Sequence, residues 1–360
     1  MSPALPTLVA AATMALACAG CSQNQVAAIY PTADLRPPFL LEAGPEDPRR
    51  VVLRFDEAVK PVEGSFASEP QAELSCLAQD RDLVVAFASD QSPGADYALV
   101  GEVDDRCGNR TRFLLEFAGW NDRAPPLRIS EAQCGKNASK TRPHRDFIEL
   151  VALADGNIGG EELSWASSVK SASYRLPAVE LRKGDYVVVH LAPEGIPEEV
   201  DELGADLSAS GGADSSPTGR DLWCSALPLP DESGAIALSL RPGTAPIDGL
   251  FYAADDKSGA LSAGRLATLV SALASAGSWP LAGATPAWED AFRWKSSPAK
   301  SICRSGTASG PEAWYATEAG GQSPGLPNLP AGTAKTQVTK TSKPAQREAQ
   351  AKKPRPTRRP

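Results

Sequence analysis

Short runs in which hydrophobic and polar residues alternate recur between residues 50 and 120. The pattern predicts four strands, at residues 51–55, 83–87, 97–100 and 112–117. Gly, Pro, Asp and Ser separate these runs, as turns between strands require. Because no strongly periodic helix lies between them, we predict an antiparallel β-sandwich for this unit.

A second group of strand-like runs follows between residues 126 and 329. The predicted strands are 127–132, 146–150, 185–190, 236–240 and 247–252. One helix is expected, from Leu266 to Ala276 with Gly277 at its end, and it should cover the sandwich as a lid. The sequence therefore predicts an all-β protein made of two sandwich domains in tandem, with disordered N- and C-terminal tails.

Four tryptophans gather in the last third of the chain. They are Trp279, Trp288, Trp294 and Trp314. We expect them to pack in the core or at the sandwich edge, in preference to forming a platform for a ligand.

Three pieces of the first unit resemble bacterial Ig-like domains of cell-surface proteins. They are VVLRFDEAV at 51–59, PGADYALV at 93–100 and DDRCGN at 104–109. The resemblance covers 50–120 and implies a spacer or adhesive module without a catalytic site. A calcium site at Asp104, Asp105 and Asn109 is the alternative to a solvated turn, and the turn is favoured.

Six pieces of the second unit, in order, resemble the lamin-tail domain, an Ig-like sandwich found in nuclear lamins and in exported bacterial proteins. The pieces are LRISEA (127–132), RDFIEL (145–150), LRKGDYVVVH (181–190), AIALSLRPGTAPIDGLFY (235–252), KSICR (300–304) and, after Trp314, SPGLPN (323–328). The resemblance covers 126–329. Residues 194–223 and 257–299 are insertions relative to the usual loops of that family.

The chain begins with a segment typical of export. Residues 8–20 are apolar and uncharged, which is too short to span a bilayer and fits the core of a signal peptide. The run ends in Cys18-Ala-Gly-Cys21, which resembles the bacterial lipobox and implies lipidation of Cys21. An ordinary cleaved signal or a buried apolar helix is the alternative. Residues 1–21 are thus predicted to be a signal peptide, and the Pro-rich residues 22–49 a tether.

Export places the remaining cysteines in an oxidising compartment. No pair of them has the spacing of a zinc site. Cys76 and Cys107 lie in one predicted domain and are the candidates for a disulfide. The pairing of Cys134, Cys224 and Cys303 is left open.

The charge of the chain is unevenly distributed. The formal net charge is −8, yet residues 335–360 contain nine basic residues and one acidic residue. Residues 330–360 have no aromatic residue to bury, and we predict that they form a disordered tail. This tail either binds anionic polymers or lipid headgroups or is a solvated spacer that binds nothing. The acidic body argues against specific binding of nucleic acid.

The motifs of common enzyme classes are missing from the sequence. There is no phosphate-binding glycine loop and no G-x-S-x-G elbow, and neither His144 nor His190 has metallohydrolase spacing. Glu149 should face away from the core and meet a backbone donor or Arg304. No catalytic residue, cofactor or metal ligand is therefore predicted.

These observations predict a non-enzymatic, lipid-anchored protein of the bacterial cell envelope, on its periplasmic or surface face. It would act as a binding or structural module, with the membrane and another envelope protein or an anionic polymer as partners. The alternative is an accessory or cryptic hydrolase. That alternative fails if Glu149, Asp146 and Arg304 lie on an open β-face.

Overall fold

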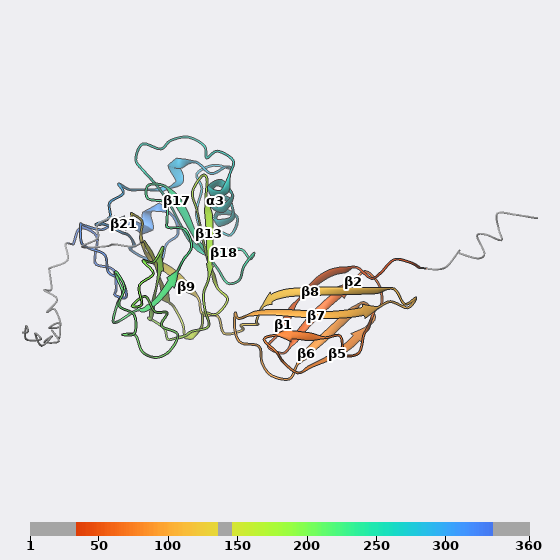
Figure 1. The fold of residues 1–360 in the computed structure, drawn as a ribbon. Coiled ribbons are helices and arrows are strands. Elements are labelled where there is room, and N and C mark those ends of the chain that lie inside the picture. Colours follow the sequence, from red (N-terminus) through yellow and green to blue (C-terminus); the bar gives the residue numbers. More distant parts are fainter. Residues whose placement is uncertain (1–33, 136–145, 334–360) are drawn as a thin grey trace, which may run out of the picture.

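The computed structural model describes residues 34–135 and 146–333 and shows an all-β protein with two domains (Figure 1). In the first domain, two four-stranded sheets face each other. One sheet has the order β1 (Leu40–Asp47), β2 (Arg50–Phe55), β6 (Asp82–Phe87) and β5 (Leu74–Gln79). In the other, β7 (Asp96–Asp104) pairs with β8 (Arg110–Ala118) on one side and with β3 (Lys60–Pro61) and β4 (Ala67–Glu69) on the other.

Alternation of side chains builds the core of this domain. In β6, the inward-facing Leu83 and Val85 are fully buried, and Leu99 and Val103 of β7 take the same position in the opposite sheet. Strand side chains project to opposite faces at successive positions, so one face of each sheet is apolar and the other meets water. All four strands predicted for this domain are confirmed within β2, β6, β7 and β8.

The predicted tether is wrong over part of its length. Residues 40–47 form β1, which pairs antiparallel with β2 and so belongs to the first domain. Pro45 and Pro48 suggested a linker, but an edge strand tolerates proline because one row of its backbone groups needs no partner. The register shifts on either side of Gly44 accommodate the irregular sequence of this strand.

In the second domain, a six-stranded and a five-stranded sheet enclose the larger core. The six-stranded sheet has the order β16 (Arg220–Cys224), β15 (Tyr186–Leu191), β10 (Phe147–Ala152), β9 (Leu127–Gln133), β20 (Ile302–Arg304) and β21 (Trp314–Ala316). All pairs in it are antiparallel except β15 with β16. The five strands predicted for this domain are confirmed as β9, β10, β15, β17 and β18.

The five-stranded sheet carries the only α-helix in the described part of the chain. Its order is β13 (Ser171–Arg175), β12 (Glu162–Ala166), β17 (Gly234–Ser239), β18 (Pro246–Ala253) and β19 (Phe292–Arg293). The helix α3 (Arg265–Ser275) packs on this sheet through Leu266, Val270 and Leu273 (Figure 1). Gly277 follows with a φ of 72° and permits the helix to stop, so the expected lid helix is confirmed.

Short elements complete the second domain. They are the two-stranded sheet of β11 (Gly156–Asn157) and β14 (Glu180–Leu181), and the 3₁₀ turns η1 (Trp288–Asp290) and η2 (Pro311–Ala313). Trp279, Trp294 and Trp314 are buried, and Trp288 is half-buried against the same core. The expectation that these tryptophans serve in packing is confirmed.

The segment between the domains is held by specific contacts. Asn121 donates hydrogen bonds from Nδ2 to the carbonyl oxygens of Asn157 (2.7 Å) and Gly159 (2.8 Å). The guanidinium carbon of Arg241 lies 4.7 Å from the centre of the Trp120 ring. Asp96 of the first domain pairs with Arg175 of the second. The connection is therefore a packed joint, with backbone groups of the second domain satisfied by the linker.

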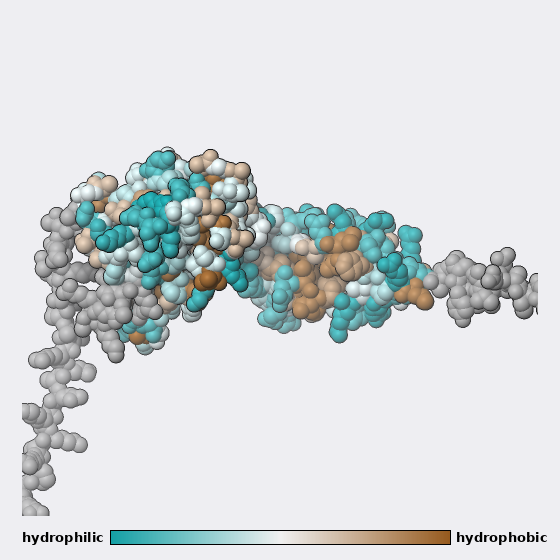
Figure 2. Space-filling model, turned by 90° about the horizontal axis from the view of Figure 1, so that it is seen from above, coloured by the Kyte–Doolittle hydropathy of each residue, from teal (hydrophilic) through white to brown (hydrophobic). Residues whose placement is uncertain are grey.

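The first domain exposes more apolar surface than the visible face of the second domain. Figure 2 shows brown areas on the first domain between rims of teal, while the visible face of the second domain is mostly teal and white. Exposed large apolar side chains of the first domain are Leu35, Phe39, Leu41, Leu77, Val100 and Leu114. Within the described residues, no helix has the length and apolar character needed to cross a membrane.

Candidate functional site

Several residues singled out in the sequence lie outside the described residues. They are Cys18, Cys21, His144 and nearly all of the basic tail. The lipidation of Cys21 and the binding of the tail to anions therefore stay predictions.

The predicted disulfide between Cys76 and Cys107 is wrong in this structure, where both thiols are free. Cys76 lies on β5 and packs against the core of the first domain, and burial raises the pKa of its thiol to about 11. Cys107 is exposed in the turn between β7 and β8, which belong to the opposite sheet. Position within one domain did not bring the two sulfur atoms together. Cys134, Cys224 and Cys303 are buried free thiols.

That turn also bears on the calcium alternative that the sequence raised. Asp105 accepts hydrogen bonds from the backbone N–H groups of Cys107 (2.7 Å) and Asn109 (2.8 Å) and from the Asn109 side chain (2.7 Å). Asp104 instead pairs with Arg110 at 2.7 Å. Asp105 thus shapes the turn, as the favoured interpretation expects.

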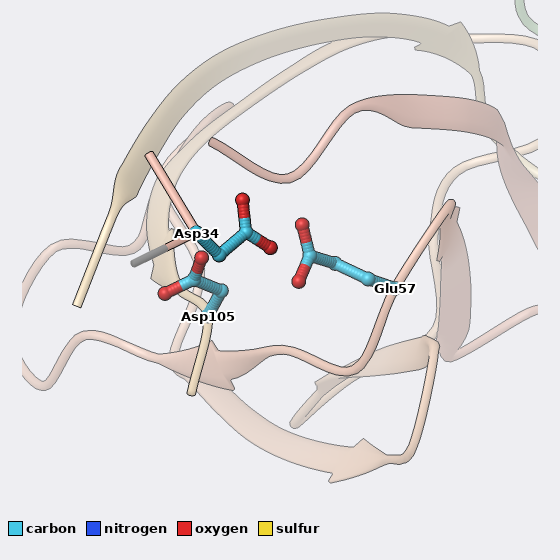
Figure 3. A group of neighbouring side chains, drawn as sticks. All are labelled: Asp34, Glu57 and Asp105. Atoms are coloured by element: carbon cyan, nitrogen blue, oxygen red, sulfur yellow. The ribbon is translucent and has the colours of Figure 1, made fainter. Parts of the chain in front are cut away.

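The structure adds two carboxylates that the sequence did not connect with Asp105. Oxygen atoms of Asp34, Glu57 and Asp105 lie within 4.8 Å of one another, and Figure 3 shows the carboxyl groups of Asp34 and Glu57 facing each other with Asp105 beside Asp34. Burial and the neighbouring Asp105 and Asp34 raise the pKa of Glu57. Carboxylates suit hard cations, but the hydrogen bonds to Asp105 explain its position without one.

Two buried glutamates form the most unusual polar cluster of the second domain. Glu131 of β9 and Glu149 of β10 lie opposite each other in the register, and both are fully buried. Residues 322–329, here called the strap, cover them. The Ser323 backbone N–H and hydroxyl both bond to Glu131, the latter at 2.9 Å, and the Gly325 N–H donates to Glu149 at 2.7 Å.

The two carboxyl groups resist ionisation. Burial raises the pKa of Glu131, and burial together with the Glu131 charge raises the pKa of Glu149 well above its ordinary value. Oε1 of Glu149 has no hydrogen-bond partner in the described part of the chain. The pair therefore attaches the strap to the sheet, and both carboxyl groups are shielded from solvent.

The structure selects one of the two partners that the sequence left open for Glu149. The expected backbone donor is present, but Arg304 does not reach this carboxylate and pairs with Asp248 at 2.6 Å. Glu149, Asp146 and Arg304 are buried and do not lie on an open β-face. An open β-face carrying these three residues would have excluded a hydrolase, and the structure does not show one. Whether the protein is a hydrolase must therefore be judged from the burial of these side chains.

The strap packs closely against the segment that contains Ser216 and Gly219. Gly325 has a φ of 73°, and a Cβ there would lie 2.6 Å from the Gly219 nitrogen and 2.1 Å from the Ser216 hydroxyl. We expect Gly325→Ala to lower the free energy of unfolding by about 3 kcal/mol, because left-handed strain of about 1–2 kcal/mol adds to the clash. Urea unfolding monitored by tryptophan fluorescence measures this.

Gly320→Ala is the matched control for this prediction. Gly320 has a φ of 76°, but a Cβ added there would meet nothing within 4 Å, so only the backbone strain remains. Equal losses in the two variants would show that the strap is not clamped at Gly325.

His190 has an acidic partner that the sequence did not reveal. Its Nε2 lies 2.8 Å from Oδ1 of Asp221, and Trp223 stacks on the imidazole with ring centres 4.1 Å apart. Asp221 also accepts the Ser216 N–H at 2.9 Å. His190 and Asp221 are both fully buried, so the pair has no route to a substrate in this conformation.

Neighbouring residues show what this buried pair does. Glu202, within the 194–223 insertion, accepts the Asp221 N–H at 2.9 Å and the Ser210 N–H at 3.1 Å. Asp201 accepts the Trp223 N–H at 2.6 Å. These carboxylates satisfy backbone donors along β16, which is the outermost strand of its sheet. The network therefore fastens the insertion to a sheet edge and closes that edge to other strands.

A cavity lies beside this edge. It has a volume of about 1050 Å³ and is bounded by the linker at 123–126, by the β11–β14 sheet with the turn that follows it, and by residues 203–207 of the insertion. Arg220 of β16 lines it and is 8% exposed. Sequence reasoning missed this cavity, because three segments far apart in the chain have to meet to form it.

A family model described as "TP_1001_2nd: protein second domain" matches residues 125–325. This range begins in the linker and ends inside the strap, and it includes every strand of the second domain. No curated protein matches the chain.

Proposed function

The chain belongs to the TP_1001_2nd second-domain family, and from this premise we propose that it is a non-enzymatic, exported and lipid-anchored module that binds or connects components of the bacterial cell envelope. The signal-like residues 1–21 and the lipobox-like Cys21 support export and anchoring. The two joined sandwiches support a role in which surfaces and loops, rather than a catalytic centre, make the contacts.

The main support for this proposal is that the buried glutamate and histidine side chains have structural roles. Glu131, Glu149 and His190 are fully buried and hold a strap or an insertion to a sheet. An active site needs such groups in a cavity that a substrate can enter. In the described residues, these side chains instead form buried hydrogen bonds that hold the fold together.

The hydrolase alternative has one observation in its favour, the hydrogen bond between His190 and Asp221. A carboxylate that orients an imidazole is the second half of a catalytic triad. The Ser216 hydroxyl, however, accepts the Gly219 N–H at 3.2 Å and lies 3.1 Å from the Thr218 hydroxyl. No nucleophile is therefore directed at the imidazole among the described residues.

We further propose that the first domain is Ig-like and the second a lamin-tail-like sandwich. The two facing sheets of each domain and the strap formed by SPGLPN support this assignment. The basic tail is proposed to bind an anionic polymer or lipid headgroups as a second contact with the envelope. Since one acyl chain gives only marginal binding to a membrane, a polybasic segment would strengthen the anchor.

Labelling with a radioactive fatty acid tests the anchor. We expect the label to enter the wild-type protein and to fall at least tenfold in Cys21→Ser, because the thiol is the acceptor of the lipid. Cys18→Ser is the matched control and should keep the label, since it changes a cysteine three residues earlier. Label that persists in Cys21→Ser would remove lipidation from the proposal.

A further inference from the structure

The strand β13 leaves one edge of the five-stranded sheet open. It is the outermost strand of that sheet, and in the described part of the chain it pairs with β12 alone. The outermost strand β16 of the other sheet differs, because Asp201 and Glu202 of the insertion accept its backbone N–H groups. An uncovered strand edge is a template for pairing with another extended chain.

The hydrogen-bond pattern identifies which backbone groups of β13 are unused. Bonded and non-bonded residue pairs alternate along an antiparallel ladder. Just before β13 the Lys170 carbonyl accepts the Ser167 N–H, and just after it the Leu176 N–H donates to the Glu161 carbonyl, so a bonded pair lies at each end. In steps of two from these ends, the residues that bond to β12 are Ala172 and Tyr174. The residues whose N–H and C=O groups point away from the sheet are Ser171, Ser173 and Arg175.

The outward backbone groups lie on an accessible length of strand. Ser171 and Ser173 are exposed, and no described residue forms a hydrogen bond with their backbone N–H or C=O groups. At the far end of the strand, the Arg175 side chain pairs with Asp96 of the first domain. The open edge therefore runs from the hairpin tip before β13 to the joint between the two domains.

A groove beside this edge determines which side chains an added strand could carry. The groove has a volume of about 580 Å³ and lies between α3 and the outer face of β12 and β13 (Figure 1). On the helix side it is lined by one stripe, made of Arg265, Thr268, Leu269 and Ala272. On the strand side the lining includes the hydroxyl groups of Ser164, Ser171 and Ser173. The Ser171 hydroxyl accepts a hydrogen bond from Nη1 of Arg265 at 2.9 Å, so its own proton is free to be donated.

The charges at the groove favour an acidic partner. Arg265 and Lys170 are exposed and form no ion pair within 4.0 Å in the part of the chain that the structure describes. The acid of the groove, Glu162, accepts the Ser164 hydroxyl at 3.3 Å and lies opposite Arg175 in the strand register. Carboxylate side chains on an added strand would meet two unpaired cations and hydroxyl donors, whereas basic side chains would meet like charges.

A single extended peptide fits this edge better than a second copy of the chain. Two antiparallel β13 strands that use all three outward residues have to be centred on Ser173. This pairing would carry the hairpin tip of the second copy, with its Val169, past Arg175 and into the joint where the first domain lies. A peptide strand that ends at the joint avoids this collision.

We propose that the open edge of β13 binds an extended acidic segment of a partner protein as an additional antiparallel strand. Residues of the added strand opposite Ser171 and Ser173 would exchange backbone hydrogen bonds with them and place their side chains on the α3 side. Acidic side chains at these alternate positions would face Arg265 and Lys170. The inference rests on the binding role proposed above and names the class of partner.

Synthetic peptides test the proposal on the full chain. The probe is an acetylated and amidated heptapeptide in which Thr and Glu alternate, and isothermal titration calorimetry should detect its binding. The same peptide with Lys in place of Glu should bind at least tenfold more weakly. N-methylation of the central Glu should also weaken binding at least tenfold, because it removes a donor to β13. N-methylation of the next Thr, whose N–H points to solvent, is the matched control and should preserve binding.

Ser173→Pro tests the same contact from the side of the protein. An edge strand tolerates proline where the N–H faces solvent, so the fold should be kept while binding of the Thr–Glu peptide falls at least tenfold. Ser173→Ala is the matched control, because it retains the backbone N–H and should retain binding. Melting temperatures of both variants report whether the sheet is intact. If Ser173→Pro lowers the melting temperature, the two N-methylated peptides on the wild type still decide.

Several outcomes would overturn the proposal. These are no binding of the Thr–Glu peptide, equal binding of the Lys peptide, equal effects of the two N-methyl groups, full binding in Ser173→Pro, or an equal loss in Ser173→Ala. A wild-type dimer seen by native mass spectrometry and lost in Ser173→Pro would make a second copy the occupant and would also overturn it. None of these results changes fatty-acid labelling at Cys21, so this inference and the anchoring proposal fail separately.

Discussion

Replacing Glu161 with Gln should make the protein more stable at alkaline pH, by about 3 to 5 kcal/mol at pH 9. Glu161 precedes β12 and is fully buried, and neither of its carboxylate oxygens has a hydrogen-bond partner in the described residues. Burial raises the pKa of this carboxyl to about 8 from an ordinary value of 4.5. Ionisation inside the protein is therefore opposed by the lost hydration of the charge.

The sign of the pH dependence follows from proton binding in the two states. Between about pH 4.5 and 8 the unfolded chain releases this proton while the folded chain keeps it, so stability falls as pH rises. Below pH 4.5 both states hold the proton, and above about pH 8 both have lost it. The contribution of Glu161 to stability is thus fully present in acid and is lost through this window.

The measurement is urea unfolding of wild type and variant at pH 5, 7 and 9. Other buried acids also titrate, so the difference between the two proteins isolates Glu161. Glu162→Gln is the matched control, since Glu162 is the next residue and is only half-buried. If wild type and Glu161→Gln lose stability in parallel from pH 5 to pH 9, the carboxyl is not held protonated by burial.

The strands that the sequence predicted share a clear physical signal. Residues 83–87 and 185–190 carry β-branched and apolar side chains that are buried in the structure, and such runs are strong indicators of strands. The strand β1 gave a weak signal, because an edge strand needs only one buried face and can contain Pro45. β16 was missed because it pairs in parallel with β15 across a long insertion.

The polar contacts of the fold could not be predicted from local pattern. Glu131 bonds to Ser323 across 192 positions, and Asp248 meets Arg304 across 56. For Glu149 the sequence left open a backbone donor or Arg304 as the partner, and the donor is the Gly325 N–H of the strap, which lies 176 positions away. Only the packing of the two sheets brings such residues together, so their sequence positions carry no signal of the contact.

Arg304→Met should cost about 3 to 5 kcal/mol of the free energy of unfolding, because it leaves a buried carboxylate without its cation. Arg304 of β20 donates from Nη2 to both oxygen atoms of Asp248, at 2.6 and 2.8 Å. Asp248 belongs to β18, so this pair connects the two sheets of the second domain. The Arg304 side chain also stacks on Trp314, with the guanidinium carbon 4.4 Å from the ring centre.

The pair also replaces part of the backbone ladder. Asp248 accepts the Ile129 N–H at 2.8 Å, and Nε of Arg304 donates to the Ile129 carbonyl oxygen at 2.8 Å. Ile129 lies beside the irregularity in the pairing of β9 with β10. Loss of either side chain therefore leaves buried backbone groups unsatisfied as well as a buried charge.

A double-mutant cycle measures this coupling. Burial raises the pKa of Asp248 even though Arg304 opposes the rise, so desolvation of the pair is costly and removing both charges should recover part of the loss. We expect Asp248→Asn and Arg304→Met each to be strongly destabilising and the double variant to be less destabilised than their sum by at least about 1 kcal/mol. Thermal unfolding of the four proteins at pH 7 gives the cycle, with Arg110→Met as a control at an exposed ion pair that should change little. Strict additivity would mean that the two side chains stabilise the sheets independently, and the proposed link between β18 and β20 would then be wrong.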